Sequence, residues 1–457
     1  MKMKTRFSNI LTPLLLAAIC ASAQYNAYLG NLHSHTSNSD GSGTPEQAFA
    51  YARDVAQIDF LAVTDHLEQI YYLPWKWSDT KSQADAATTD GVFIGIAGYE
   101  WSCPYTNHVN VFNTPNMVTP LSYFDWPRFY NDVLDERPAF AQFNHPGREE
   151  LAHDWNNFAY VGPAVDSAFA LIEVREFYQD SFYQMALDSG WHVSPVSNQD
   201  NHSADWGTKN DHRAGIWATE LTREALFEAI VAGRTFSTHD KNAQIWIQID
   251  HTPMGSRVER APYMRLTINL FDPDEEGWSI VDVRASGGRS LFTLPPREEN
   301  VDTMIVLSLT DEKWVFVRAC QPDGQWIWSA PVYIEGTPLA VEEQRALPQG
   351  VSISVFPNPF NSSVRFSIDG IGTHGLAPLQ VEIYDLAGRQ VAEIPVGESL
   401  RAFPLDGNSE NGSAQGHSPT TRQFIWQPDE SLPSGVYLVR VLSGGAFTPS
   451  TRVIYLK

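Results

Sequence analysis

The chain has 457 residues, with 54 acidic and 31 basic side chains and a formal net charge of −23. Its 43% hydrophobic and 19% charged residues are typical of a folded protein and argue against a disordered one. This length predicts two to four domains. The excess of acid argues against a protein that binds the nucleic-acid backbone, because such binding needs clustered Lys and Arg. Ten of the 13 histidines lie between His33 and His239, and this crowding needs an explanation.

The N-terminus has the pattern of an export signal. Basic residues open the chain, an apolar run covers residues 10–19, and Ala21-Ser22-Ala23 follows as a cleavage site. About ten apolar residues are too few to span a membrane, which needs roughly 20. We therefore predict a secretory signal peptide over residues 1–23 and a secreted or cell-surface protein. No other segment has transmembrane length.

Residues 24–242 alternate short apolar runs with helical stretches, a pattern that favours βα units and a largely parallel sheet. Thr44, Pro45 and Gln47 predict a capped helix start, and a second helix is predicted over residues 222–232. The aromatic-rich segment 71–91 shows no clear period and is interpreted as a loop that walls a pocket or packs over the rim. The predicted strands are residues 28–33, 59–64, 92–99, 139–144, 168–174 and 192–197.

The remainder of the chain reads as all-β. Residues 243–336 alternate apolar and polar side chains, which predicts a β-sandwich domain. Residues 337–350 contain Pro338 and Pro348 and are the predicted linker. Short strands and tight turns over residues 351–457 predict a second small all-β domain.

Metal-binding residue types gather at the ends of the predicted strands. Because the carboxyl ends of parallel strands meet on one face, these side chains are expected to converge. Imidazole and carboxylate groups together suit transition metals. The candidates are His33, His35, Asp40, His66, Glu100, His108, His145, Asp200 and His202.

These motifs resemble the PHP family, the polymerase and histidinol phosphatase metallohydrolases. The resemblance rests on His33-Ser34-His35 with Ser39-Asp40-Gly41, Thr64-Asp65-His66, Glu100 followed by His108, His145-Pro146-Gly147 and Asp200-Asn201-His202. It implies a distorted (β/α)7 barrel that holds two to three divalent ions, which zinc, manganese or iron would fit.

The resemblance also implies how the ligands are shared among the ions. A first ion would bind His33, His35, Glu100 and Asp200. Glu100 would bridge to a second ion with His108 and His145. The third ion would bind Asp40, His66 and His202.

Three further side chains are candidates for catalysis. Asp65 precedes His66 and would orient a histidine or the nucleophile, or else cap the strand end. Arg148 and Arg213 follow metal-binding motifs and would stabilise charge on a phosphate. Structural salt bridges are the alternative for both arginines.

The expected activity is hydrolysis of a small polar ester, most favourably a phosphoester, by a metal-bridged hydroxide. Residues 190–195, 221–223 and 233–238 resemble secreted carbamate-hydrolase-like members of the family, and this resemblance leaves the substrate open. Because Lys and Arg are scarce near the motifs, hydrolysis of a carbamate, amide or carboxyl ester is the alternative. The alternative outside the enzymes is a noncatalytic surface protein whose barrel is stabilised by metal.

Residues 351–457 resemble the C-terminal sorting domain of type IX secretion cargo. The resemblance rests on residues 356–361, 381–389 and 432–437, and it implies the type IX secretion machinery as a partner. A carbohydrate-binding or other β-module is the alternative. After signal removal the chain would keep Cys103 and Cys320, whose pairing the sequence leaves open.

Overall fold

The computed structural model describes most of the chain up to residue 338 and several segments beyond it. The described ranges are 25–120, 125–148, 153–261, 263–338, 352–371, 379–385, 389–395, 420–429, 431–443, 446–447 and 451–457. The predicted signal peptide and nearly all of the predicted linker lie outside these residues. Among the described residues, no helix is long and apolar enough to cross a membrane.

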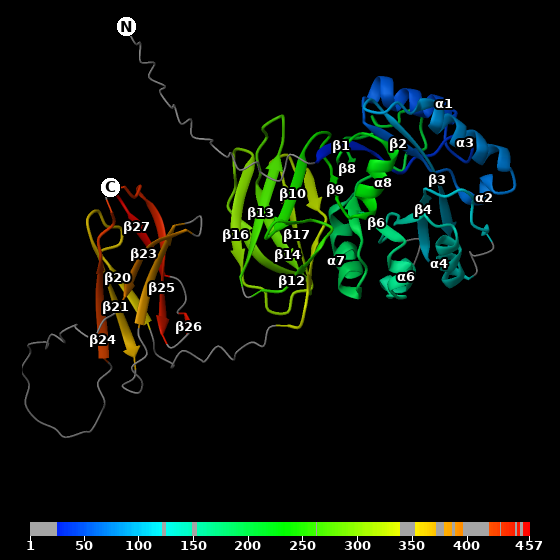
Figure 1. Ribbon diagram of the computed structural model, residues 1–457. Coiled ribbons are helices and arrows are strands. Elements are labelled where there is room, and N and C mark those ends of the chain that lie inside the picture. Colours follow the sequence, from blue (N-terminus) through cyan, green and yellow to red (C-terminus); the bar gives the residue numbers. More distant parts are fainter. Residues whose placement is uncertain are drawn as a thin grey trace, which may run out of the picture. The chain divides into compact units, whose positions relative to one another are not determined.

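The chain divides into two compact units (Figure 1). The first contains the described residues up to Arg257, together with Leu270–Asn300 and Trp314–Tyr333. The second contains Val258–Asn269, Val301–Lys313 and the residues from Ile334 onward. Parts of the segment 243–336 belong to each unit, and the predicted domain boundaries stay predictions.

The first unit is mixed α/β, as expected. Its strands up to residue 242 are β1 (Asn26–Asn31), β2 (Phe60–Val63), β3 (Ile94–Cys103), β4 (Asn107–Phe112), β5 (Phe140–Phe143), β6 (Phe169–Glu173), β7 (Ser194–Val196), β8 (Arg213–Ala218) and β9 (Thr235–Thr238). Its helices are α1 (Pro45–Tyr51), η2 (Ala52–Ala56), α2 (Leu67–Ile70), α3 (Pro74–Ala87), α4 (Trp126–Asp135), α5 (Asp154–Phe158), α6 (Pro163–Asp166), η4 (Phe177–Gln179), α7 (Asp180–Ser189) and α8 (Arg223–Val231).

The sheet runs in the order β9-β8-β1-β2-β3-β4-β5-β6-β7. β1–β2, β2–β3, β5–β6 and β6–β7 pair in parallel, whereas β3–β4, β4–β5, β1–β8 and β8–β9 are antiparallel. Its two ends adjoin, since the Thr235 hydroxyl of β9 donates to the Pro195 carbonyl of β7 at 3.0 Å. The exact (β/α)7 count stays a prediction.

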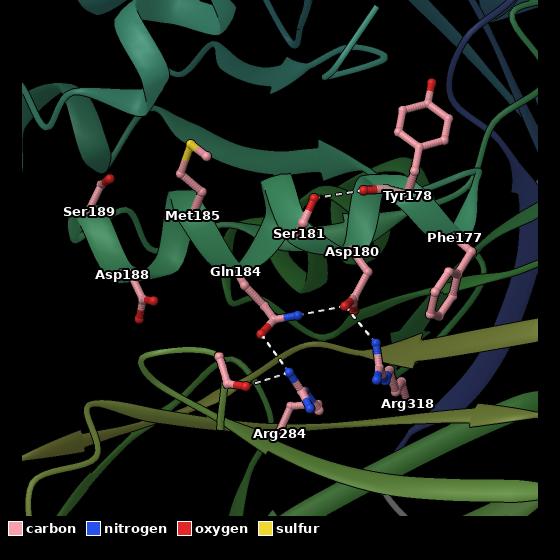
Figure 2. A pocket seen from close by; sticks show the side chains of 11 residues that line it. Phe177, Tyr178, Asp180, Ser181, Gln184, Met185, Asp188, Ser189, Arg284 and Arg318 are labelled. Atoms are coloured by element: carbon pink, nitrogen blue, oxygen red, sulfur yellow. Dashed lines mark hydrogen bonds and ion pairs between the residues drawn. The ribbon is translucent and has the colours of Figure 1, made fainter. Parts of the chain in front are cut away.

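The sheet continues beyond β9 into the following segment. Thr238 of β9 pairs with Ile327 of β18 (Trp326–Ser329), and β17 (Trp314–Cys320) joins β18 to β14 (Ile280–Ala285) and β15 (Arg289–Leu294). Arg318 and Arg284 on these strands reach Asp180 and Gln184 on α7 (Figure 2). Further strands of this segment are β10 (Gln244–Ile249), β11 (Thr252–Pro253), β12 (Arg257–Glu259), β13 (Met264–Phe271), β16 (Val301–Leu307) and β19 (Val332–Glu335).

Local sequence signals explain the helix starts. Thr44 accepts a hydrogen bond from the Gln47 amide, and the Gln47 side chain accepts from the Thr44 amide, so the predicted capping box is confirmed. Thr222 caps α8 in the same position.

The loop interpretation of residues 71–91 is wrong, because α3 occupies most of that segment. Its buried residues are Trp77, Thr80, Ala84 and Ala87, which follow helical spacing. These positions carry small or polar side chains beside a single Trp, so they give no apolar period.

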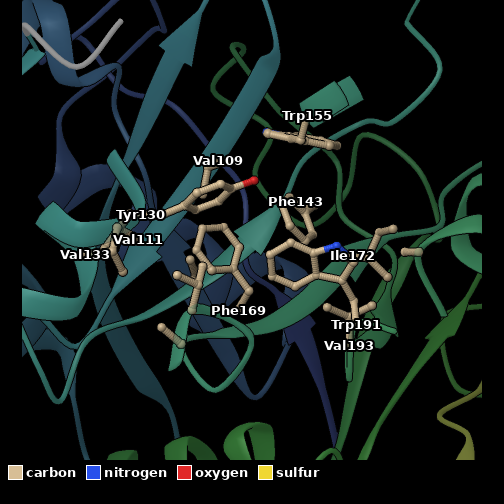
Figure 3. Close-up of a cluster of buried hydrophobic side chains, with 14 of the residues drawn as sticks. Val109, Val111, Tyr130, Val133, Phe143, Trp155, Phe169, Ile172, Trp191 and Val193 are labelled. Carbon is tan, nitrogen blue, oxygen red and sulfur yellow. The ribbon is translucent and has the colours of Figure 1, made fainter. Parts of the chain in front are cut away.

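Buried aromatic rings fill the core on the side of β4–β7 (Figure 3). Phe143 and Phe169 lie with their ring centroids 4.8 Å apart, and Trp191 packs edge-on against Phe143 at 5.1 Å. Each fully buried ring contributes roughly 1.5–3 kcal/mol through loss of water contact. The core therefore holds rigid the strand ends from which the candidate ligands project.

The C-terminal segment is all-β where it is described. One sheet contains β20 (Ser352–Phe356), β21 (Val364–Ile371) and β24 (Thr420–Trp426). The other contains β22 (Leu379–Asp385), β23 (Gln390–Pro395), β25 (Gly435–Ser443), β26 (Ala446–Phe447) and β27 (Thr451–Tyr455). Phe366 of one sheet and Val381 of the other belong to one core. Its sorting role stays a prediction.

Candidate metal centre

Two backbone bridges bring distant motifs together. The amide of His35 donates to the Asn201 carbonyl at 2.8 Å, and the amide of Asp200 donates to the His33 carbonyl at 3.1 Å. His66 and Glu100 form a second, parallel bridge. Ligand candidates separated by up to about 170 residues therefore lie on adjacent backbone segments.

Asp65 positions the turn that carries Asp40. Its carboxylate accepts hydrogen bonds from the amide and hydroxyl of Thr36, at 2.8 and 2.7 Å, and from the hydroxyl of Ser39 at 2.6 Å. These contacts are to the turn, and the predicted role of Asp65 in orienting a histidine or the nucleophile stays a prediction.

Glu100 lies at the centre of the nine candidate ligands. Its two carboxylate oxygens are 3.1–3.5 Å from ring nitrogens of five histidines: His33, His35, His66, His108 and His145. Glu100 is buried. A carboxylate has about four lone-pair positions, so five imidazoles exceed what simple hydrogen bonding satisfies.

The described residues form three groups whose possible ligand atoms lie within 4.8 Å of one another. The first is His33, His35 and Asp200, and the second is Glu100, His108 and His145. The third is His35, Asp40, His66 and His202. All nine predicted ligand residues occur in these groups. Glu100 falls only in the second group and not also in the first, and His35 falls in the third group as well as the first. That these residues bind metal stays a prediction. A mixture of imidazole and carboxylate donors suits divalent transition metals.

The three groups differ in their access to solvent. His33, His35 and Glu100 are buried, whereas Asp40 is 44% and His202 39% exposed in their side chains. The third group is therefore the open end of the centre, where a substrate can approach.

Two predicted ligands have unusual backbone conformations. His145 has φ 31° and Asp200 has φ 46°. Both angles lie at positive φ, a backbone region that residues other than Gly rarely adopt. A hydrogen bond from the His145 amide to Glu173 Oε2, at 2.7 Å, helps to hold this conformation. Such strain persists where the surrounding structure enforces it, commonly at functional sites.

Strong electrostatic coupling shifts the pKa values of the buried groups. Burial lowers the pKa of His33, but the Asp200, Glu100 and Glu173 carboxylates raise it well above its usual range. Burial raises the pKa of Glu100, but the charges of His33 and His108 bring it well below. The same carboxylates would attract a divalent cation, which would replace the imidazolium charge.

Glu173, at the end of β6, was missed by the sequence analysis. Its Oε1 lies 2.9 Å from Nδ1 of His33 and accepts a hydrogen bond from the side-chain Nδ2 of Asn198 at 3.1 Å. Burial raises the pKa of Glu173, but Arg175 and His33 lower it to about 2. The available signal was a lone charge at the end of an otherwise apolar strand.

Basic groups also lie beside the centre, and none of them was predicted. Arg175 Nη1 is 3.3 Å from Asp200 Oδ2, and Lys209 Nζ donates to the Asp200 carbonyl at 3.2 Å. Lys76, on α3, donates to the carbonyl of Asn38 at 2.7 Å, two residues from Asp40. Their position in the fold identifies these cations, since proximity in sequence to a motif does not distinguish Lys76 and Lys209 from other basic residues.

The two predicted arginines are placed differently. Arg213 is buried and donates to the backbone carbonyls of Asn210 and His212 at 3.1 and 2.8 Å. Arg148 is exposed on the turn after His145. A catalytic role for the two arginines stays a prediction. Cys103 and Cys320 are both buried and are not joined to each other by a disulfide.

No family model and no curated protein matches the chain. Among solved structures, it is similar to a two-domain protein from Bacteroides vulgatus ATCC 8482 that contains a predicted PHP-like metal-dependent phosphoesterase. The identity is 17% and the TM-score 0.38, over 72% of this chain and 99% of that one. Dimeric latent PorU from Porphyromonas gingivalis matches with 16% identity and a TM-score of 0.16, over 46% of this chain and 20% of that one. Likenesses this weak assign neither a family nor an activity.

Proposed function

We propose that the protein is an exported metal-dependent hydrolase that acts on phosphoesters. The observation that carries the proposal is the Glu100 carboxylate, buried and within 3.5 Å of five imidazole nitrogens. Glu100 would be able to bind two of the ions, and the exposed side chains of Asp40 and His202 would leave the third site open to substrate.

The donor set fits divalent ions. The Nδ1 atom of His33 faces Glu173, so a proton shared between them leaves the Nε2 lone pair directed at Glu100 and Asp200. His35 Nε2 lies 3.3 Å from both His33 Nε2 and Asp200 Oδ1. The Nε2 atoms of His33 and His35 both lie close to the Asp200 carboxylate. These three side chains would therefore be able to bind the same cation.

Divalent ions supply a water of lowered pKa and polarise the bond to be cleaved. The chain itself holds the substrate. Arg175 is the best-placed cation, because its guanidinium lies beside Asp200 and can donate to phosphate oxygens. Lys209 and Lys76 add positive charge near the same loops.

Metal content of the full chain tests the centre. Elemental analysis of purified protein is expected to find two to three transition-metal ions per chain. Glu100→Gln should lose two of them together, while Glu46→Gln, at an exposed helix position, should lose none. A wild-type chain without bound metal would contradict the proposal.

Substrate preference tests the chemistry. Metal-loaded protein is expected to hydrolyse aryl phosphates faster than matched aryl carbamates or carboxyl esters. The basic groups beside Asp200 support this order, because an uncharged carbamate gains less from them. Faster turnover of carbamates would favour the alternative activity, and inactivity despite full metal loading would favour a noncatalytic surface protein.

Export by the type IX machinery is proposed from the sequence patterns alone, namely residues 1–23 and 351–457. Expression in a host with that pathway should release a protein that lacks both segments, as measured by mass spectrometry of the medium. Retention inside the cell with both segments intact would contradict it.

A further inference from the structure

A groove outside the metal centre lies in the first unit, between α7 and the strands β14 and β17. It has a volume of about 810 Å³. Figure 2 shows Phe177 and Tyr178 at one end of α7 and Asp188 and Ser189 at the other. We propose that this groove binds an uncharged saccharide chain.

Exposed aromatic surface is the first observation. Phe177 is 48% and Tyr178 52% exposed, and Met185 continues the exposed face of α7. Phe177 is held in place, since its ring lies 4.6 Å from that of Trp326 and 5.3 Å from the Arg318 guanidinium. A fixed, solvent-exposed ring offers a flat apolar surface at little entropic cost, which suits the apolar face of a sugar ring.

The charges of the groove neutralise one another. Arg318 pairs with Asp180 at 2.6 Å and with Asp282 at 3.1 Å. Arg284 lies 3.5 Å from Asp282 and donates to the Gly288 carbonyl at 2.7 Å. With both guanidinium groups engaged, the groove offers little to attract an anionic ligand.

Hydrogen-bond acceptors remain at the exposed rim. The Asp188 carboxylate accepts from the Gly287 amide and the Trp314 indole, both at 3.1 Å, and stays exposed. Ser181 donates to the Tyr178 carbonyl at 2.8 Å, which leaves its oxygen able to accept. Rings beside carboxylate and hydroxyl acceptors complement the hydroxyl-lined edges of a saccharide.

The groove and the metal centre share one loop, because Arg175 and Phe177 are two residues apart. Saccharide binding itself needs no metal. It can therefore be measured in the presence of EDTA, so that its failure is distinguishable from failure of the proposed hydrolase activity.

Affinity electrophoresis of the full chain, in gels that contain a soluble β-glucan, xylan, mannan or dextran, tests the proposal. At least one neutral polysaccharide is expected to retard the protein, and calorimetry with its oligosaccharide gives the dissociation constant. Tyr178→Ala and Phe177→Ala should each weaken binding about tenfold. Phe271→Ala is the matched control, because Phe271 is also 48% exposed and lies outside the groove.

Thermal unfolding of each variant shows whether it is folded. Phe177 contacts Trp326, so Tyr178→Ala serves as the variant with less effect on packing. The proposal is overturned if no neutral polysaccharide binds, if an anionic polymer such as polygalacturonate binds more tightly, or if both folded variants bind like the wild type.

Discussion

Glu173 Oε1 lies 2.9 Å from Nδ1 of His33, and both side chains are completely buried. This contact fixes the ring orientation of His33 and directs Nε2 toward Glu100 and Asp200. The pair links a residue that the sequence motifs mark to one that they do not. It also explains why β6 ends in a charged residue.

Glu173→Gln is predicted to weaken metal binding by about 10- to 100-fold, because the orienting carboxylate loses its charge. Isothermal titration of the metal-free protein with Zn²⁺ or Mn²⁺ measures this loss. Thermal unfolding in EDTA provides the control, since a variant that has merely lost its fold would melt early without metal. Unchanged affinity in a folded variant would show that the contact is only structural.

Arg175→Met is predicted to reduce kcat/KM for a phosphate ester by about 100-fold and for a carboxyl ester by much less. The reason is that only the phosphate gains a charge-assisted contact from the guanidinium. Steady-state kinetics on both esters measure the difference, with Arg128→Met at an exposed position of α4 as the control. An equal loss on both substrates would instead mean that Arg175 acts by holding Asp200.

The ligand motifs were predictable because each is local: His33 and His35, or Asp200 and His202, sit two residues apart at a strand end. Their convergence also follows from the strand arrangement. The sequence marks Glu173 only as a charged residue at the end of an apolar strand, and it gives no such signal for Arg175. Their roles come from contacts with His33 and Asp200, which are distant in sequence. α3 was missed for a different reason, because Thr80, Ala84 and Ala87 bury a face without an apolar period.

A stacked histidine pair predicts a loss of stability in acid. The rings of His212 and His239 are nearly parallel, with centroids 4.5 Å apart. Burial, together with the charge of His212, lowers the pKa of His239 to about 3. Since this is below the unfolded value near 6.5, the stabilisation is complete above pH 6.5 and is lost as the pH falls toward 3.

His239→Gln is therefore expected to flatten the decline of unfolding free energy between pH 7 and pH 4. Urea unfolding in EDTA at several pH values measures it, with His251→Gln, at an exposed position, as the control. If the wild type and His239→Gln decline in parallel, His239 does not carry this pH dependence.

The turn formed by residues 155–158 predicts a gain of stability. Residues 155–158 all have φ between 50° and 57°, although none is Gly. The left-handed conformation costs such residues roughly 1–2 kcal/mol each, and Gly avoids this cost.

Asn157 is exposed, so Asn157→Gly removes little packing. We expect it to leave unfolding free energy unchanged or raise it by up to about 1 kcal/mol, as measured by urea unfolding. Asn131→Gly, inside the right-handed helix α4, should instead lower it by about 0.5 kcal/mol. If both substitutions lower the unfolding free energy by a similar amount, the left-handed turn is contradicted. Asn157 would then have the same right-handed helical conformation as Asn131.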